Sequence, residues 1–342
     1  MILAGDIGGT HTRLALLHEE GGRLVVDAEQ VYISREYAGL DEPVKLFLNG
    51  AKGTVQTACF GIAGPVIKGR ATTPNLTWVV DVQSLVKSTS IASIWLINDL
   101  QAHASGVDDL RESDFVPLNS ASSTEGNAAL IAAGTGLGEA GLYWDGVRRH
   151  AFACEGGHAD FAPRNDLEIE LHRYLLAKFG RVSYERVVSG PGLKNIYDFL
   201  RDSRIEAEPQ WLRDELDSAP DPAAVISGHG LLAKAAICER ALDIFVSVYG
   251  AEAGNLALKL LATGGVFLSG GIAFQIVTRL QRPDFLQAFV DKGRMHPLME
   301  GIPVRVVNNE QVGLIGAARY ALQHARKAPS PCPAQVDFER RR

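Results

Sequence analysis

One pattern occurs twice in this chain: a glycine-rich turn between two apolar segments. The first copy lies within residues 1–17 and turns at 8–10, and the second runs from 129 to 144 and turns at 134–138. Each copy is typical of a β-hairpin. The copies lie about 129 residues apart, which predicts two halves built on one plan. Because the shared residues are mostly glycine and apolar, chance similarity is the alternative.

Length and charge narrow the class of protein. A chain of 342 residues suggests about two domains and can bury enough surface to need no disulfide or metal. Its net charge of −6 argues against a nucleic-acid partner, since duplex binding depends on neutralising phosphates. The longest uncharged stretch, 260–278, holds four glycines, so we expect no membrane segment. Without a leader pattern or a C-x-x-C pair, we expect a cytoplasmic protein.

Apolar periodicity predicts an α/β chain. Short buried segments alternate with helical spacing in the first third, whereas 166–263 is mostly helical in pattern. Beyond the two hairpins, we expect strands at 24–31, 59–63, 94–97, 265–268 and 304–307, and helices at 40–48, 100–104, 167–179, 232–249, 272–280 and 312–322.

The first glycine turn is a candidate phosphate site. Adjacent glycines expose backbone N–H groups that can hold an anion, and these are Gly8, Gly9 and Thr10. Asp6 just before them makes sense beside phosphate if Mg²⁺ bridges the two, bound to the carboxylate through water. A plain hairpin is the alternative.

The second glycine turn is not a known nucleotide motif. Residues 134–138 include Gly134, Thr135, Gly136 and Gly138, with no Lys-Ser or Lys-Thr after them, which excludes a Walker A loop. A tight structural turn is the alternative, but two such loops together are suited to clamp a nucleotide's phosphates. Gly270 and Gly271 form a further turn between a strand and a helix, suited to a base or ribose or merely to packing.

Polar residues in three places are candidates for acid–base chemistry or hydroxyl binding. Asn98 and Asp99 follow a buried strand, where α/β folds bind ligands; they are equally favoured as helix caps. Glu155 and His158 lie in a glycine-containing loop, which argues against a helical di-iron motif. With Cys154 alone beside His158, structural zinc is not expected. An ordinary surface loop is the alternative here, and a solvated acid is the alternative for Glu185.

Taken in order, these segments resemble the bacterial glucokinase family, the hexokinase-type group of the sugar kinase, actin and heat-shock ATPase superfamily. The resemblance runs from about residue 2 to 322. Its pieces are 5–10, 61–66, 75–78, 97–99, 134–138, 155–163, 185–193 and 269–272.

The resemblance implies a ribonuclease H-like or actin-like ATPase fold with two α/β domains and an interdomain cleft. We expect a small domain of 1–108 plus 303–325, a large domain of 109–302 and a flexible tail, 326–342. The last helix is expected to return to the first domain. Family members are commonly homodimers.

The resemblance also implies an activity: ATP and Mg²⁺ are the cofactors, glucose is the acceptor and glucose 6-phosphate the product. Asp99 is implied as general base in an in-line transfer. The other implied roles are sugar contacts at Asn98, Glu155, His158, Glu185, Asn75 and Gly136, and nucleotide contacts at Asp6, Gly8, Gly9, Thr10, Gly134, Thr135, Gly138, Gly270 and Gly271. A kinase for another hexose, a sugar-responsive regulator and a chaperone-like ATPase are the alternatives.

The chain departs from the family pattern at two places. His11 replaces a more frequent Asn, and Pro74 precedes Asn75 where many relatives have no proline. These departures affect the first phosphate loop and the Asn75 contact. The cysteine-rich zinc motif of the neighbouring ROK kinases is absent, which favours the glucokinase group.

Overall fold

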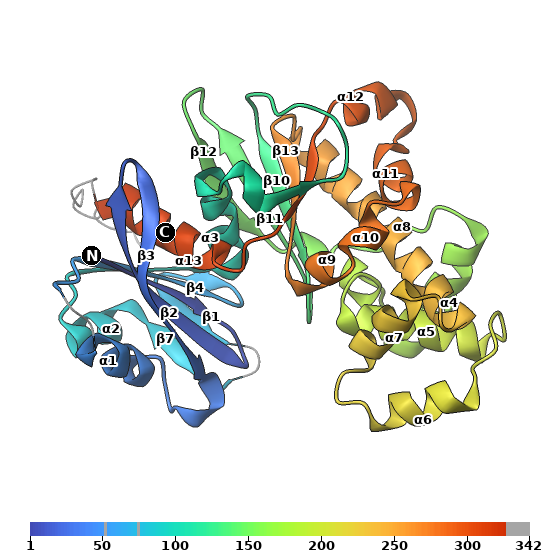
Figure 1. Cartoon of the computed structure of the whole chain (residues 1–342), viewed down its shortest axis with the longest axis horizontal. Helices are drawn as coiled ribbons and strands as arrows, with labels where there is room; N and C mark the ends of the chain where they lie inside the picture. The colour runs from blue at the N-terminus through green and yellow to red at the C-terminus, as the bar shows by residue number, and fades with distance from the viewer. Residues whose placement is uncertain (51–52, 74–75, 326–342) are drawn as a thin grey trace, which may run out of the picture. The chain divides into compact units, whose positions relative to one another are not determined.

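The computed structural model describes residues 1–50, 53–73 and 76–325, so Asn75 and the predicted tail lie outside the described part. The chain divides into two compact units (Figure 1). Unit 1 comprises Met1–Asp109 and the chain from Gln311 on, and unit 2 comprises Leu110–Glu310.

Unit 1 is built on a five-stranded sheet with the order β3-β2-β1-β4-β8. The predicted first hairpin is confirmed: β1 and β2 pair antiparallel, with Ile7 opposite Thr12. β4 and β8 continue the sheet in parallel with β1. The strands are β1 (Ile2–Ile7), β2 (His11–Glu20), β3 (Arg23–Ile33), β4 (Thr57–Ile62) and β8 (Ser93–Asn98), and a separate small sheet contains β5 (Val66–Ile67), β6 (Arg70–Thr72) and β7 (Val79–Asp81).

Two helices cover one face of this sheet, α3 (Asp99–Gly106) and the last helix, α13 (Val312–Ala325). They approach closely because glycines lie between them: a Cβ on Gly316 would overlap the Ala102 carbonyl oxygen. The expected return of the last helix to the first domain is thus confirmed, as Figure 1 shows. α1 (Asp41–Asn49) and α2 (Val82–Thr89) add Val44, Phe47 and Leu85 to the unit's apolar core.

Unit 2 repeats the same strand order with one addition, β12-β11-β10-β13-β14-β9. Again an antiparallel hairpin, β10 with β11, lies beside parallel strands, β13 and then β14. The internal repeat predicted from the two glycine turns is therefore present in the topology. The strands are β9 (Phe115–Pro117), β10 (Ala128–Ala133), β11 (Leu137–Trp144), β12 (Arg149–Cys154), β13 (Gly265–Ser269) and β14 (Val304–Val307). Because β14 pairs here, unit 1 resumes at Gln311 rather than at residue 303.

The helices of unit 2 form one large apolar core with its sheet. The longest is α8, whose side chains are buried over most of its length, as expected of a helix apolar on all sides. Side chains cap several helices, as Asn165 does for α4 by accepting the Glu168 N–H. The helices are α4 (Asp166–Phe179), α5 (Gly190–Asp202), α6 (Gln210–Ser218), α7 (Pro222–Leu231), α8 (Ala236–Leu260), α9 (Gly271–Gln275), α10 (Val277–Leu280), α11 (Pro283–Val290) and α12 (His296–Glu300).

Two helix predictions in unit 2 are wrong in detail. The stretch expected to be helical from Leu232 on begins only at Ala236, because Leu232 ends α7 and is 65% exposed. The helix expected at 272–280 is broken into α9 and α10 at Ile276, which has φ −103° and ψ 19°. Ile276 is fully buried, so packing of its side chain accompanies the break.

Candidate active site

The first glycine turn links β1 to β2 and is held by two hydrogen bonds from Ser34. The Ser34 hydroxyl donates to the Gly8 carbonyl (2.9 Å), and the backbone N–H of Ser34 donates to the Thr10 carbonyl (3.0 Å). The Gly8 N–H donates to His11 O within the turn. Among the described residues, no acceptor receives the amides of Gly9 and Thr10. The turn is thus rigid, and it keeps two backbone donors for an anion.

Asp6 is half-buried at the carboxyl end of β1, next to this turn. Its charge raises the pKa of buried His103, although burial is the larger effect and lowers that pKa overall. No cluster of three or more acidic, His or Cys ligands occurs within the described residues. A single carboxylate beside a glycine turn with free backbone donors fits Mg²⁺ held together with phosphate, because Mg²⁺ retains waters and takes most other ligands from phosphate.

Asn98 and Asp99 lie where β8 ends and α3 begins. The Asn98 Oδ1 accepts the N–H groups of Leu100 (2.9 Å) and Gln101 (3.2 Å), which confirms the helix-cap alternative for this residue. Its Nδ2 donates to the Gly64 carbonyl (3.2 Å), which leaves one amide hydrogen for a ligand. Asp99 Oδ1 also accepts from Leu100 N–H, and a helix's first turn favours its negative charge.

The sheet of unit 1 brings Asp6, Asn98 and Asp99 to one edge. β1, β4 and β8 run parallel, and the register aligns Asp6 with Gly61 and Gly61 with Ile97. Their carboxyl ends therefore meet at the same edge, about 10 Å apart across two strand spacings. A Cβ on Gly61 would lie 2.8 Å from the Ala102 Cβ, so glycine there permits the close approach of α3.

The second glycine loop links β10 to β11 and opens into a cavity of about 540 Å³. β10 and β13 are parallel, so the loop at 134–138 and the turn at 270–271 lie at the same sheet edge. Cβ atoms on Gly134 and Gly271 would meet nothing within 4 Å. In the described chain, the amides of Thr135 and Gly136 also donate to no acceptor. The Gly134 backbone and the Thr135 amide give this cavity a wall suited to phosphate, and Gly136 follows them in the loop.

Glu155, His158 and Glu185 form one cluster. His158 Nε2 lies 4.0 Å from Glu155 Oε2, and its Nδ1 lies 3.9 Å from Glu185 Oε1. Two carboxylates and an imidazole offer several acceptors and donors to neighbouring hydroxyls. The cluster is partly exposed, with 31% to 62% of each side chain accessible. Glu155 and His158 are exposed, as the surface-loop alternative expects, and the fold brings Glu185 to them from a second segment.

Gly136 connects the cluster of Glu155, His158 and Glu185 to the glycine loop. The N–H of Leu137 donates to Glu185 Oε2 (3.0 Å), and a Cβ on Gly136 would lie 2.6 Å from the same oxygen. The Gly190 N–H donates to the Gly134 carbonyl (2.8 Å). The glycine loop thus fixes Glu185 on one side and lines the cavity on the other.

Sequence reasoning missed part of the cavity wall. The start of α7 lines it with Asp221 and Ser227, and α9 adds Gln275. The Pro-Asp-Pro segment at 220–222 is a helix-start signal, and Asp221 caps α7 through the Ala223 and Ala224 N–H groups. That signal marks a helix, but it does not indicate that the helix faces a ligand.

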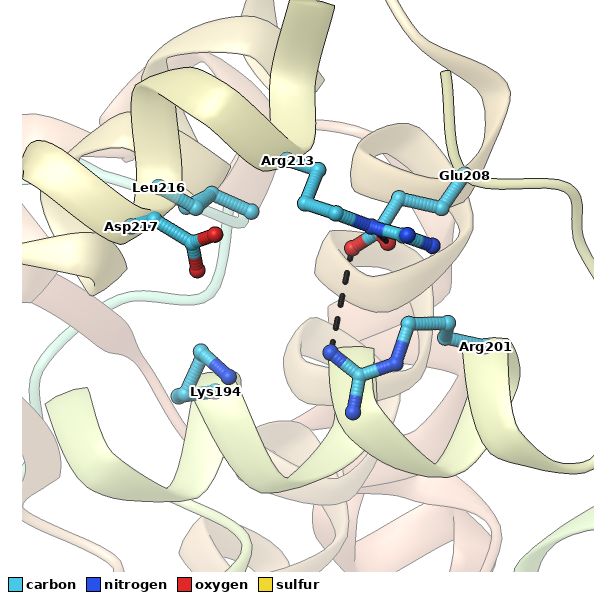
Figure 2. Close-up of a pocket in the computed structure, with 6 residues that line it drawn as sticks. All are labelled: Lys194, Arg201, Glu208, Arg213, Leu216 and Asp217. Atoms are coloured by element: carbon cyan, nitrogen blue, oxygen red, sulfur yellow. Dashed lines mark hydrogen bonds and ion pairs between the residues drawn. The ribbon is translucent and has the colours of Figure 1, made fainter. Parts of the chain in front are cut away.

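A second cavity of about 250 Å³ contains none of the predicted site residues (Figure 2). It lies between α5 and α6, and the side chain of Glu208 is only 3% exposed there. Glu208 pairs with Arg213 (2.7 Å) and Arg201 (3.8 Å) and accepts the Tyr197 hydroxyl. These cations lower the pKa of Glu208 against the effect of burial. The cluster joins the two helices by paired charges.

Among the described residues, no helix is both long and apolar enough to span a membrane. The described cysteines, Cys59, Cys154 and Cys238, are free thiols.

Comparisons with known proteins agree with the sequence pattern. A glucokinase from Nostoc punctiforme is 43% identical over 333 residues, covering 93% of this chain and 98% of that protein. The structure of a glucokinase from an Antarctic psychrotroph has a TM-score of 0.82 and 29% identity, covering 94% of this chain and 98% of that one.

A more distant structure has the same fold. The ROK family glucokinase from Streptomyces griseus, in complex with glucose and AMPPNP, has a TM-score of 0.65 at 19% identity over 94% of this chain and 99% of that one. The fold is the expected actin-like ATPase fold. The Glucokinase family model matches residues 3–324, and with this match over nearly its whole length the chain belongs to the glucokinase family.

Proposed function

We propose that this chain transfers the γ-phosphoryl group of ATP to the 6-hydroxyl of D-glucose, giving glucose 6-phosphate. The proposal rests on the position of the glycine loop at 134–138, which adjoins both the cavity and Glu185. Gly134 and Thr135 line the larger cavity, while Gly136 contacts Glu185 of the cluster of Glu155, His158 and Glu185, which we call the hydroxyl-binding cluster. One loop therefore adjoins both a space of ligand size and side chains suited to a polyol. Membership in the glucokinase family supports the assignment.

ATP is the donor in this proposal. The cavity of about 540 Å³ lies within the usual range of small-molecule sites. The Thr135 and Gly136 amides are directed to its phosphates in our proposal, and Gly270 and Gly271 to its adenosine. The complex of the S. griseus protein with AMPPNP supports an adenine nucleotide as donor.

Glucose is the acceptor. In this proposal, Glu155 and Glu185 accept hydrogen bonds from sugar hydroxyls. His158, which lies between the two carboxylates, forms a hydrogen bond with another hydroxyl. Because Glu185 already accepts the Leu137 N–H, one of its oxygens is positioned before sugar arrives. A hydroxyl that is missing or misplaced leaves such groups unpaired, which is the basis for discrimination among hexoses. Asn98 adds its remaining amide hydrogen.

Asp99 is the general base in this proposal. Its carboxylate accepts the proton of the 6-hydroxyl while that oxygen bonds to the γ-phosphorus, and the bond from phosphorus to the β–γ bridging oxygen breaks in line. Asn98 assists by capping α3, which fixes the first residue of that helix. The amides of Gly9 and Thr10 bind phosphate oxygens.

Asp6 is the residue that would hold Mg²⁺, through water. When bound with ATP, Mg²⁺ offsets negative charge on the phosphates. The proposal also includes a homodimer and a cytoplasmic location. Free Cys59, Cys154 and Cys238 support a reducing compartment, and light scattering on the purified protein tests the dimer.

A coupled assay of ADP release tests the activity. We expect ATP consumption to depend on glucose and to be slower with mannose and fructose at equal concentration. Hydrolysis of ATP at the same rate without sugar contradicts the proposal. A faster rate with another hexose identifies a different acceptor.

Asp99→Asn tests the base. Loss of general-base catalysis lowers kcat by about 10²–10⁴-fold, while glucose binding changes little because the amide keeps the shape of the side chain. Asp166→Asn is the matched control, since Asp166 is also the first residue of a helix after a capping Asn, Asn165, and is exposed. Near-normal turnover of Asp99→Asn contradicts the assignment.

A further inference from the structure

A pair of buried carboxyl groups lies beneath the proposed sugar site. Glu139 on β11 is 1% exposed, and Glu252 on α8 is fully buried. After burial, the charge of Glu252 is the largest effect that raises the pKa of Glu139, and a side-chain hydrogen bond with Glu252 adds to it, so the two groups lie close together. Two carboxylates have only acceptors, so a hydrogen bond between them requires one proton. Sequence analysis did not identify either residue.

Two lysines, Lys259 and Lys292, act on Glu252 by their charge, and of these only Lys259 also lowers the pKa of Glu139. Lys259 lies 3.4 Å from Glu252 Oε1, but its own side chain is 54% exposed. Asn255 donates to Glu252 Oε2 (2.9 Å). Cys154 and Tyr249 are the other titratable groups facing Glu139. Glu139 Oε1 is buried and, within the described chain, has no hydrogen-bond partner.

The Glu139 carboxyl lies directly against the loop that holds Glu155 and His158. Glu139 faces Cys154 across the β11–β12 ladder, and the loop begins at the next residue. A Cβ on Gly156 would overlap Glu139 Oε2, and a Cβ on Gly157 would overlap the Leu137 carbonyl. The backbone of the loop therefore has no space between itself and this carboxyl group.

The pair also connects to the segment that holds Glu185. Asn255, bound to Glu252, donates to the Tyr184 hydroxyl (2.9 Å). Tyr184 precedes Glu185, and its N–H donates to the Ala159 carbonyl (3.0 Å) just after the sugar loop. Hydrogen bonds thus run from the Glu139–Glu252 pair to both segments of the hydroxyl-binding cluster.

We propose that Glu139 and Glu252 share one proton, and that this proton positions the Glu155–His158 loop for the hexose. Glu139 is then a positioning residue that acts through the loop and does not touch the sugar. The inference rests on the proposed sugar site and adds a pH dependence to it. Loss of the proton places two negative charges side by side in a buried space, and their repulsion displaces the loop resting on Glu139.

The pH window follows from the environment of Glu139. Burial, and next the charge of Glu252, raise its pKa to about 8, against a smaller opposite effect of Lys259. Glu139 is thus mostly protonated at pH 7 and mostly ionised at pH 9. The fraction of molecules with the loop in position falls about tenfold between these values, so the apparent Kd for glucose rises about tenfold.

Calorimetric titration of glucose into the full chain, without nucleotide, tests this at pH 7 and pH 9. We expect the wild-type Kd to rise about tenfold. Glu139→Gln retains the size of the side chain and a donor toward Glu252 but cannot ionise. Its Kd is expected to stay within about threefold of the wild-type pH 7 value at both pH values. A tenfold rise retained in Glu139→Gln overturns the inference.

Two further variants complete the test. Cys154→Ala removes a second titratable group that faces Glu139 and is expected to keep the wild-type rise; if it abolishes the rise, the thiol is responsible and the inference is overturned. Glu139→Leu, with folding checked by circular dichroism, should bind glucose weakly at both pH values, and wild-type affinity in this variant also overturns it. If wild-type protein binds no glucose at either pH, the proposed function itself fails.

Discussion

Asn98 and Asp99 are neighbours that both accept the Leu100 N–H, but the Asn98 side chain also bonds to Gln101 and Gly64. The Asn98 oxygen and one of its amide hydrogens bond to backbone groups around it, so capping accounts for its position while one amide hydrogen remains for a ligand. The sequence favoured both interpretations because a residue after a buried strand and a residue before a helix occupy the same place in an α/β fold. Glu139 could not be found in this way, since its partner is 113 positions away in the chain and only packing brings them together.

Glu185→Gln tests the hydroxyl-binding cluster. The amide keeps the shape of the side chain but loses the charge that strengthens hydrogen bonds to sugar hydroxyls. Such bonds contribute about 1.5–3 kcal/mol, so we expect the KM for glucose to rise about 10-fold or more while the KM for ATP stays within about twofold. Steady-state kinetics measure both. Glu170→Gln, on the exposed surface of α4, is the control, and an unchanged glucose KM for Glu185→Gln argues against the role.

At the level of elements, strands and hairpins followed the sequence pattern more closely than helices did. Turn glycines and apolar runs specify a hairpin locally, as β1–β2 and β10–β11 show. Helix ends depend on packing as well. Leu232 fits an apolar helical spacing but is exposed after α7, and the helix expected through Ile276 breaks where that side chain is buried.

Gly316→Ala tests whether the contact of α13 with α3 supports the site. Its new Cβ would overlap the Ala102 carbonyl of α3, so the helices must separate. Overpacking of this kind costs about 1–3 kcal/mol, and kcat should fall because α3 begins with Asp99. Urea unfolding and turnover measure the two effects. Gly228→Ala in α7 meets open space and is expected to be neutral or stabilising by up to about 1 kcal/mol. Equal urea midpoints for the two variants exclude this role.

At the scale of the whole molecule, the two units share one strand order and place a glycine turn at the same end of each sheet. The sequence predicts this repeat because each hairpin is specified by nearby residues. The walls of the larger cavity come from helices far apart in the chain, such as α5, α7 and α9, and their arrangement depends on the common core of unit 2. Local patterns contain no information on that arrangement.

The buried carboxyl pair gives global stability a pH dependence of defined sign. The pKa of Glu139 is raised from 4.5 to about 8, so between these values the folded chain keeps a proton that the unfolded chain has released. The free energy of unfolding must then fall as pH rises through this window, by up to about 1.4 kcal/mol per pH unit from this group. Above about pH 8 both states have lost the proton, and the contribution becomes constant.

Thermal unfolding of wild type and Glu139→Gln at pH 5, 6.5, 8 and 9 measures this effect. The amide side chain of the variant binds no proton in either state, so the variant lacks the decline that Glu139 causes. We expect the Tm of the variant to rise relative to wild type from pH 5 to pH 8 and the difference to level off by pH 9. Groups remote from the Glu139–Glu252 pair titrate equally in both proteins and cancel in the comparison. A Tm difference that is the same at all four pH values means that Glu139 is ionised in the folded chain throughout.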